Sequence, residues 1–159
     1  MAELRILVDA DACPVKDEIY KVAWRHGVAV KVVSNMWLRV PDHALIDRVV
    51  VGAAFDAADD WIAERAGATD VVVTGDILLA DRCLKKGATV LGHNGKPFTM
   101  ASIGGAIATR AIMADLRSGA GVSGGPAPFA KADRSRFLQA LDQAVHKARR
   151  DSSRAKLGG

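Results

Sequence analysis

The sequence predicts an α/β fold, namely a single doubly wound parallel sheet of about five strands with helices on both faces. Short apolar runs of strand length recur along the chain, and a helical segment follows most of them. Glycines stand where these helices are expected to end, at Gly27, Gly67 and Gly87. Strands that are apolar throughout are typical of a parallel sheet covered on both faces.

The first half of the chain predicts three strands and two helices. The expected strands are 4–9, 28–33 and 48–51, and the expected helices are 14–26 and 55–66. Pro14 suits the first turn of a helix because its ring fixes φ and it has no N–H to leave unpaired. A loop containing Pro41 joins the second strand to the third.

The second half continues the alternation. The expected strands are 71–74 and 88–91, and the expected helices are 76–86, 99–117 and 133–150. The last helix is amphipathic and places Phe137, Leu141 and Val145 on one face. We expect a turn at 93–97, a glycine- and proline-rich loop at 119–128, a single domain over 1–150, and a disordered basic tail at 151–159.

Composition narrows the class of protein. Half of the residues are hydrophobic and a quarter are charged, which is typical of a globular domain. No apolar run approaches the roughly 20 residues that span a bilayer, so we expect a cytoplasmic protein without a membrane partner. Residues 131–159 hold eight of the 22 basic residues and three of the 18 acidic ones. An acidic site beside this basic segment suits a polyanion such as nucleic acid, although a basic tail also serves solubility.

Two carboxylates follow the first strand in the segment I-L-V-D-A-D-A-C-P. Asp9 and Asp11 are two residues apart, so at a strand end they point to the same side. Carboxylates held close together repel unless a proton or a cation lies between them. Mg²⁺ and Mn²⁺ prefer such oxygen ligands, which predicts a metal site. The alternative is that one Asp caps the helix after Pro14 while the other is solvated.

Polar residues also follow the other expected strands. Ser34 and Asn35 follow the second strand, Asp56 follows the third, and Asp76 and Asp81 follow the fourth. Because the carboxyl ends of parallel strands share one edge, we expect these groups to gather there, where such folds place their sites. Asp56 and Asp76 would also serve as helix N-caps, so this alternative stays open.

Four ordered motifs resemble the YaiI/YqxD family of uncharacterised bacterial proteins. They are I-L-V-D-A-D-A-C-P, G-A-A-F-D-A-A-D-D-W-I, D-V-V-V-T-G-D-I-L-L-A-D and G-G-P-A-P-F-A-K-A-D-R-S-R-F. That family is related to the PIN-like and NYN ribonuclease domains, which use metal ions held by acids at strand ends. The resemblance implies metal ligands at Asp9, Asp56 and Asp76, and it adds Asp11 and Asp81, where the relatives vary, as further catalytic candidates.

The implied reaction is metal-assisted hydrolysis of phosphodiester bonds, with RNA as the expected substrate. Mg²⁺ or Mn²⁺ would lower the pKa of a water and neutralise charge on the phosphate. Ser34, Asn35, Arg110 and Arg134 are candidate substrate-binding residues.

Two other functions are kept as alternatives. The D-x-D motif and the late G-D-x-x-x-x-D also resemble haloacid-dehalogenase-type phosphatases, in which the first Asp is a nucleophile. Against this, no lysine lies between Lys31 and Lys85, and Pro14 starts a helix where those enzymes insert a flap. The other alternative is a non-catalytic module that keeps the acidic pocket and binds RNA or a protein through the Gly119–Pro128 loop and the basic last helix.

Overall fold

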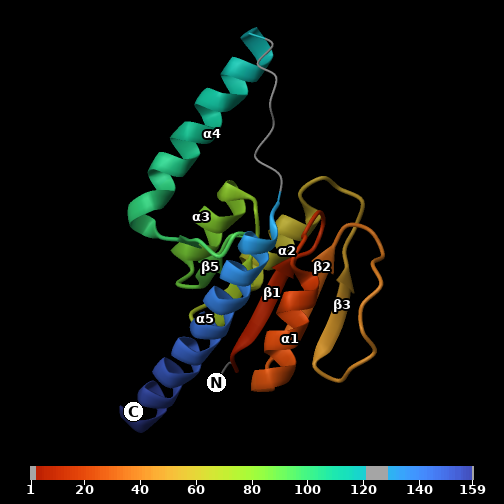
Figure 1. Cartoon of the computed structure of the whole chain (residues 1–159), viewed down its shortest axis with the longest axis vertical. Helices are drawn as coiled ribbons and strands as arrows, with labels where there is room; N and C mark the ends of the chain where they lie inside the picture. The colour runs from red at the N-terminus through yellow and green to blue at the C-terminus, as the bar shows by residue number, and fades with distance from the viewer. Residues whose placement is uncertain (1–2, 121–128, 159) are drawn as a thin grey trace.

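A single sheet of six strands organises the chain. The structure is a computed structural model and describes residues 3–120 and 129–158. The strand order is β3-β2-β1-β4-β5-β6, and every neighbouring pair is parallel except β5 and β6 (Figure 1). The strands are β1 (Arg5–Asp9), β2 (Ala29–Ser34), β3 (Ile46–Val50), β4 (Asp70–Val73), β5 (Thr89–Leu91) and β6 (Pro97–Phe98). The expected α/β sheet is confirmed.

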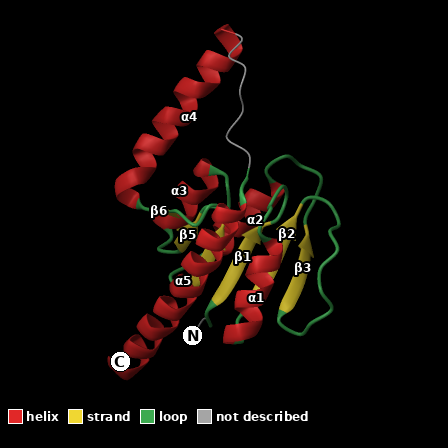
Figure 2. Cartoon of the chain, in the orientation of Figure 1, coloured by secondary structure: helices red, strands yellow, loops and turns green. Residues whose placement is uncertain are grey.

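Helices cover both faces of this sheet (Figure 2). They are α1 (Lys16–His26), α2 (Ala57–Arg65), α3 (Ile77–Lys85), α4 (Met100–Ala120) and α5 (Lys131–Gly158). α1 and α5 pack on one face, whereas α2, α3 and the start of α4 pack on the other. The rest of α4 extends away from the domain (Figure 1). Within the described residues, no helix combines the length and apolar character needed to cross a membrane.

The two faces of the sheet account for the uniformly apolar strands. In β1, Ile6 and Val8 are buried under α1 and α5, and Leu7 is buried under the helices of the opposite face. Alternation with a period of two sends successive side chains to opposite faces, so both sets must be apolar. Burying one such side chain contributes about 1.5–3 kcal/mol.

The strand order creates a crevice between β1 and β4. The chain leaves β1 toward α1 on one face of the sheet and leaves β4 toward α3 on the other. The two connections therefore separate at the carboxyl ends of these neighbouring strands, which is where doubly wound sheets form their binding crevices. The fold thus places the ends of two acidic motifs side by side.

The structure departs from the sequence prediction at three places. The expected turn at 93–97 leads into β6, which pairs antiparallel with β5 and is too short to give an apolar pattern. α4 continues to Ala120, and the rest of the expected 119–128 loop lies outside the described residues. α5 continues to Gly158, so the expectation of disorder after residue 150 is wrong for 151–158. No glycine or proline interrupts the segment 151–157.

Gly95 fixes the approach of the β5–β6 turn to α5. Its φ is +85°, a conformation that side chains other than glycine rarely adopt. A Cβ at this position would lie 2.7 Å from the carbonyl oxygen of Arg136. Only glycine fits both the backbone conformation and the space beside α5.

Candidate metal centre

An open cleft of about 840 Å³ lies at the carboxyl ends of β1 and β4. Four of the residues that line it are aspartates, namely Asp9, Asp11, Asp59 and Asp76. Its other walls come from the loop after β2, the start of α2, the turn after β5 and helix α4. The cleft therefore joins segments that are about one hundred residues apart in the sequence.

Thr74 connects the two central acids. Its hydroxyl donates a hydrogen bond to Oδ2 of Asp9 over 2.8 Å, and its oxygen accepts one from the backbone N–H of Asp76 over 3.0 Å. Oδ1 of Asp76 accepts from the N–H groups of Leu78 and Leu79, so Asp76 is the N-cap of α3. The capping alternative is thus confirmed for Asp76, and the same carboxylate lines the cleft.

Asn35 holds the other side of the cleft together. Its backbone N–H donates to Oδ2 of Asp11 over 2.9 Å, and its side-chain oxygen accepts from the N–H of Ala58 over 3.2 Å. Ala58 lies in the first turn of α2, whose N–H groups have no partner within the helix. Asn35 therefore ties the loop that carries Asp11 to the helix that carries Asp59.

Burial and the charges of neighbouring carboxylates raise the pKa values of Asp59 and Asp9. The pKa of Asp59 rises to about 6, first through burial and then through the negative charges of Asp9, Asp76 and Asp56. The pKa of Asp9 is also raised, chiefly by burial, although the Thr74 hydrogen bond opposes the shift. A cation placed among these carboxylates would relieve this repulsion.

Three other acids after β3 and β4 do not line the cleft. Asp56 is exposed at the N-cap position of α2 and makes no side-chain capping bond. Its negative charge contributes to the raised pKa of Asp59. Asp60 pairs with Arg82 over 2.9 Å. Asp81 pairs with Lys85 over 2.8 Å. The structure thus brings Asp9, Asp11 and Asp76 together, as expected, and adds Asp59.

Of the four expected substrate-binding residues, two line the cleft. Asn35 does so beside Asp11, and Arg110 does so from α4. Ser34 is fully buried and donates to the carbonyl of Met36 over 2.5 Å. Arg134 donates to the carbonyl of Pro14 over 2.6 Å, so it joins α5 to the start of α1.

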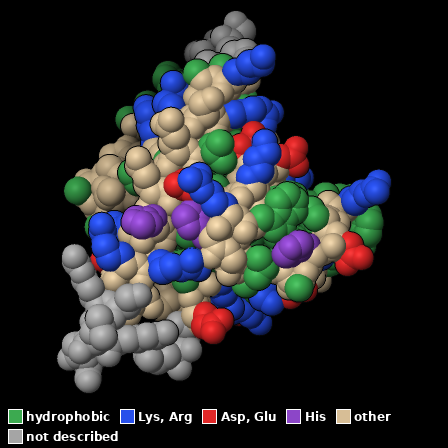
Figure 3. All heavy atoms as spheres, turned by 60° about the horizontal axis from the view of Figure 1, so that its bottom comes forward, with side chains coloured by type: hydrophobic (Ala, Val, Ile, Leu, Met, Phe, Trp, Pro, Cys, Tyr) green, Lys and Arg blue, Asp and Glu red, His purple; other side chains and the backbone are tan. Residues whose placement is uncertain are grey.

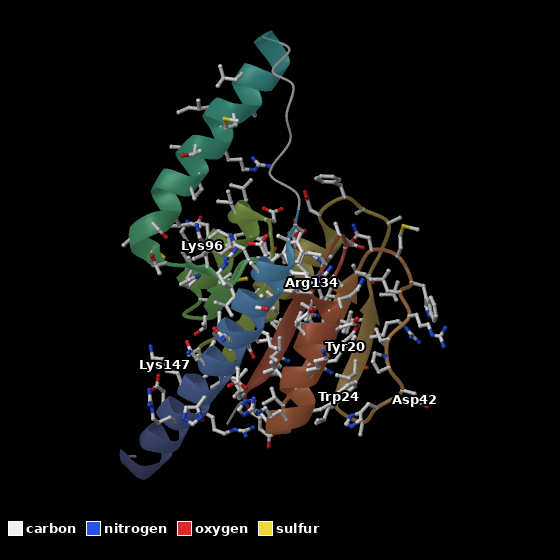
Figure 4. The ribbon with its side chains drawn as sticks, in the orientation of Figure 1. Tyr20, Trp24, Asp42, Lys96, Arg134 and Lys147 are labelled. Carbon is white, nitrogen blue, oxygen red and sulfur yellow. The ribbon has the colours of Figure 1, made fainter. Side chains whose placement is uncertain are left out.

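The basic surplus of the last helix does not gather around the cleft. α5 begins near the carboxyl edge, where Figure 4 labels Arg134, and runs to the opposite end of the sheet past Lys147. Figure 3 brings that opposite end forward and shows Lys and Arg side chains spread over it, with histidines among them. The expectation of a basic segment flanking the acidic site is therefore wrong for most of α5. The apolar face of α5, with Phe137, Leu141 and Val145, packs on the sheet along the length of the helix and so carries the basic residues away from the cleft.

His93 is a further residue of the cleft, contributed by the turn after β5. A Cβ on Gly75 would lie 3.0 Å from Cε1 of this ring, so the glycine makes room for the histidine next to Asp76. Burial lowers the pKa of His93, and its Nε2 is buried without a hydrogen-bond partner among the described residues. The neutral imidazole thus adds no positive charge to balance the aspartates.

The donor set suits a hard divalent cation that keeps part of its water shell. Within the described residues, no three Asp, Glu, His or Cys side chains lie close enough together to form a complete metal cage. Mg²⁺ is usually bound by one or two carboxylates, with water and phosphate oxygens completing the shell. Asp9 and Asp76 line the same cleft and meet that requirement, and Asp59 adds a third negative charge.

Sequence comparison assigns the chain to a family. The sequence model described as "Uncharacterized BCR, YaiI/YqxD family" matches residues 7–147. The chain belongs to the YaiI/YqxD family. The cleft residues from Asp9 to Met113 all lie within the matched region.

Relatives in the YaiI/YqxD family are similar over nearly their whole length. A UPF0178 protein of Sphingopyxis alaskensis is 74% identical over 146 residues, which cover 91% of this chain and 95% of the relative. A UPF0178 protein of Nitrobacter winogradskyi is 60% identical over 150 residues, which cover 94% and 96%. One of Rhodopseudomonas palustris strain BisB18 is 57% identical over 155 residues, which cover 98% and 100%. No solved structure matches the chain significantly.

In this YaiI/YqxD protein, sequence reasoning missed Asp59, Thr74 and His93 as parts of the site. Asp59 carried a detectable signal, because it precedes Ile62 and Ala63 by three and four residues and so shares their buried face of α2. His93 also carried one, since it follows a strand at the same edge as the acids. Thr74 ends an apolar run, and only the structure shows that its hydroxyl bridges two acidic segments.

Proposed function

We propose that this protein is a metal-dependent nuclease that hydrolyses phosphodiester bonds, with RNA as its substrate. The observation that carries the proposal is the convergence of Asp9, Asp59 and Asp76 on one cleft, where burial and then the neighbouring negative charges raise the pKa of Asp59 to about 6. Excess negative charge at the switch point of a parallel sheet favours binding of a cation and, through it, of a phosphate. The choice of RNA rests on the resemblance to ribonuclease domains.

Each side chain has a separate part in this proposal. Asp9 and Asp76 would hold Mg²⁺ or Mn²⁺, and we assign to Asp59, which lines the cleft, the part that the family resemblance implied for Asp56. The cation would supply an activated water and neutralise charge on the scissile phosphate. Arg110 reaches the cleft from α4 and would bind a neighbouring phosphate. Thr74 fixes the orientation of Asp9.

The test is cleavage of single-stranded RNA in the presence of Mn²⁺. We expect the wild-type protein to cleave, and the Asp9→Asn and Asp76→Asn variants to lose at least about a hundredfold in rate. Asp81→Asn is the matched control, because Asp81 is paired with Lys85 outside the cleft and its variant should keep the activity. A folded, metal-loaded wild-type protein that cleaves neither RNA nor DNA would contradict the proposal.

A non-catalytic binding module is the second candidate. It requires no metal ion, so it is compatible with the incomplete set of ligands among the described side chains. Under this alternative, Asp9→Asn and Asp76→Asn would leave RNA binding unchanged, whereas replacing the exposed Lys147, Arg149 and Arg150 of α5 by Ala would weaken it. Cleavage that depends on Asp9 would exclude it.

The phosphatase alternative lacks a supporting feature in the cleft. Haloacid-dehalogenase-type enzymes use a lysine to stabilise the phosphoryl group, and none of the described residues lining the cleft is a lysine. Hydrolysis of a simple phosphomonoester that disappears in Asp9→Ala would favour this alternative over the nuclease.

A further inference from the structure

Phe55 stands at the rim of the acidic cleft, where the described residues cover very little of its side chain. Its side chain is 92% exposed, the highest value among the large hydrophobic residues that the structure describes. It also lines the cleft, together with Ile77 and Met113. An aromatic ring gains most from burial against another surface, so this position calls for an explanation.

The local structure gives Phe55 no evident role in folding. It directly precedes Asp56, the N-cap of α2, where an apolar residue usually packs on the fourth helical residue. That fourth residue is Asp60, which pairs with Arg82. Two other aromatic rings are covered by arginines. The guanidinium carbon of Arg48 lies 4.5 Å from the ring centroid of Trp37, and that of Arg65 lies 4.2 Å from the ring centroid of Trp61. No such partner covers Phe55 among the described residues.

We propose that Phe55 forms a nucleobase subsite beside the metal centre, where it stacks on an unpaired base of the bound nucleic acid. This inference rests on the proposed function, since it names how the same cleft recognises its substrate. The cleft combines two features that match the two parts of a nucleotide. The aspartates would hold a cation and, through it, the phosphate, and the ring of Phe55 would stack on the base. Arg110 carries the positive charge that complements a phosphate in the same cleft.

The geometry selects an unpaired base over a paired one. In a duplex, both faces of a base already stack on its neighbours, so the ring of Phe55 finds no free face. A single strand can turn a base outward onto the ring while its phosphate stays at the aspartates. Stacking tolerates different bases, because every base has a π face, and so the subsite distinguishes single strands from duplexes more than one sequence from another.

The first experiment measures binding of a fluorescein-labelled single-stranded RNA of about 12 nucleotides by anisotropy, with Ca²⁺ in place of Mn²⁺. We expect Phe55→Ala to weaken binding about tenfold and Phe55→Trp to restore it. Ile112→Ala is the matched control, because Ile112 is 60% exposed on α4 and does not line the cleft. Equal affinities of Phe55→Ala and wild type would overturn the subsite.

A second experiment links the ring directly to a base. RNAs that carry one abasic position at successive sites are bound to wild type and to Phe55→Ala. We expect one position at which base removal weakens binding to wild type about tenfold and has little further effect on the variant. Equal losses in both proteins at every position would contradict stacking.

The outcomes separate this inference from the nuclease proposal. A wild type that cleaves RNA while Phe55→Ala binds equally well overturns only the base subsite. A wild type that does not cleave but loses binding in Phe55→Ala overturns only the nuclease and supports the subsite. Sedimentation supplies the last check: a wild-type dimer that becomes monomeric in Phe55→Ala would show that a second copy covers the ring, and would overturn the proposal.

Discussion

The hydroxyl of Thr74 donates a hydrogen bond to Oδ2 of Asp9 over 2.8 Å and so joins the carboxyl ends of β4 and β1. The same oxygen accepts the N–H of Asp76 over 3.0 Å. The side chain of Thr74 is fully buried. It therefore links the carboxylate of Asp9 to the backbone of Asp76, the two residues on which the proposed cation site depends.

Replacing Thr74 by Val removes both bonds while keeping the shape of the side chain. We expect the free energy of unfolding to fall by about 1–3 kcal/mol, because buried polar groups lose their partner. The pKa of Asp9 should rise further, since the Thr74 bond holds it down. Urea denaturation and NMR titration of the Asp9 carboxyl carbon measure the two effects. Thr74→Ser keeps the hydroxyl and should behave like the wild type.

Divalent cations should stabilise the fold through the aspartate cluster. At about 100 times the dissociation constant, a ligand that binds only the folded state adds about 2.7 kcal/mol to stability. We therefore expect Mn²⁺ to raise the Tm of the wild type and to have little effect on Asp9→Asn or Asp76→Asn. Differential scanning calorimetry makes the comparison, and an Asp81→Asn variant that loses the Mn²⁺ effect would argue against a site in the cleft.

Asp59 should make stability depend on pH. Its pKa of about 6 in the folded protein exceeds the ordinary value of 3.8, so the folded state holds this proton more tightly than the unfolded chain does. Ionisation therefore destabilises the fold, and stability should fall as pH rises from about 4 to about 6. Because solvent screens this partly exposed side chain, we expect a loss of about 1 kcal/mol.

The Asp59→Asn variant tests this assignment. It removes the charge with little change in shape, so its stability at pH 8 should exceed that of the wild type. Its profile between pH 4 and pH 6 should be flatter, since the ionisation of Asp59 no longer contributes to it. Denaturant titrations at a series of pH values measure both differences. Parallel profiles for the two proteins would show that Asp59 ionises normally.

Gly95→Ala should destabilise the contact between the β5–β6 turn and α5. The new Cβ would meet the carbonyl oxygen of Arg136 at 2.7 Å, and φ is +85° at this position. A loss of about 1–3 kcal/mol is expected in chemical denaturation. Gly104→Ala is the control, because a Cβ there meets nothing within 4 Å and alanine favours the helix α4. That control should be as stable as the wild type or slightly more stable.

Sequence patterns predicted the parallel strands and the helices between them within a few residues. Continuous apolar runs such as Val71–Val73 have no polar face, so they fit only a sheet covered on both sides. The acids at the strand ends followed from the same topology, and this placed Asp9, Asp11 and Asp76 together correctly. Asp56 and Asp81 fitted the same rule, but their side chains do not line the cleft.

Other features depended on contacts between distant segments. β6 consists of two residues and exists because it pairs with β5, and the role of Arg134 follows from the carbonyl of Pro14, which is 120 residues away in the chain. The exposure of Phe55 likewise follows from how the described segments pack around the cleft, which the residues next to Phe55 in the sequence do not indicate.

The α/β class, the family and the edge of the sheet at which carboxylates gather can be predicted from the amino-acid sequence, because hydrophobic period and strand-end position are local properties of the chain. That Asp59 lines the cleft while Asp56 does not, and that Thr74 links Asp9 to Asp76, became visible from the folded arrangement. Hydrogen bonds and charge repulsion act over a few ångströms in space, whatever the separation of the residues in the chain.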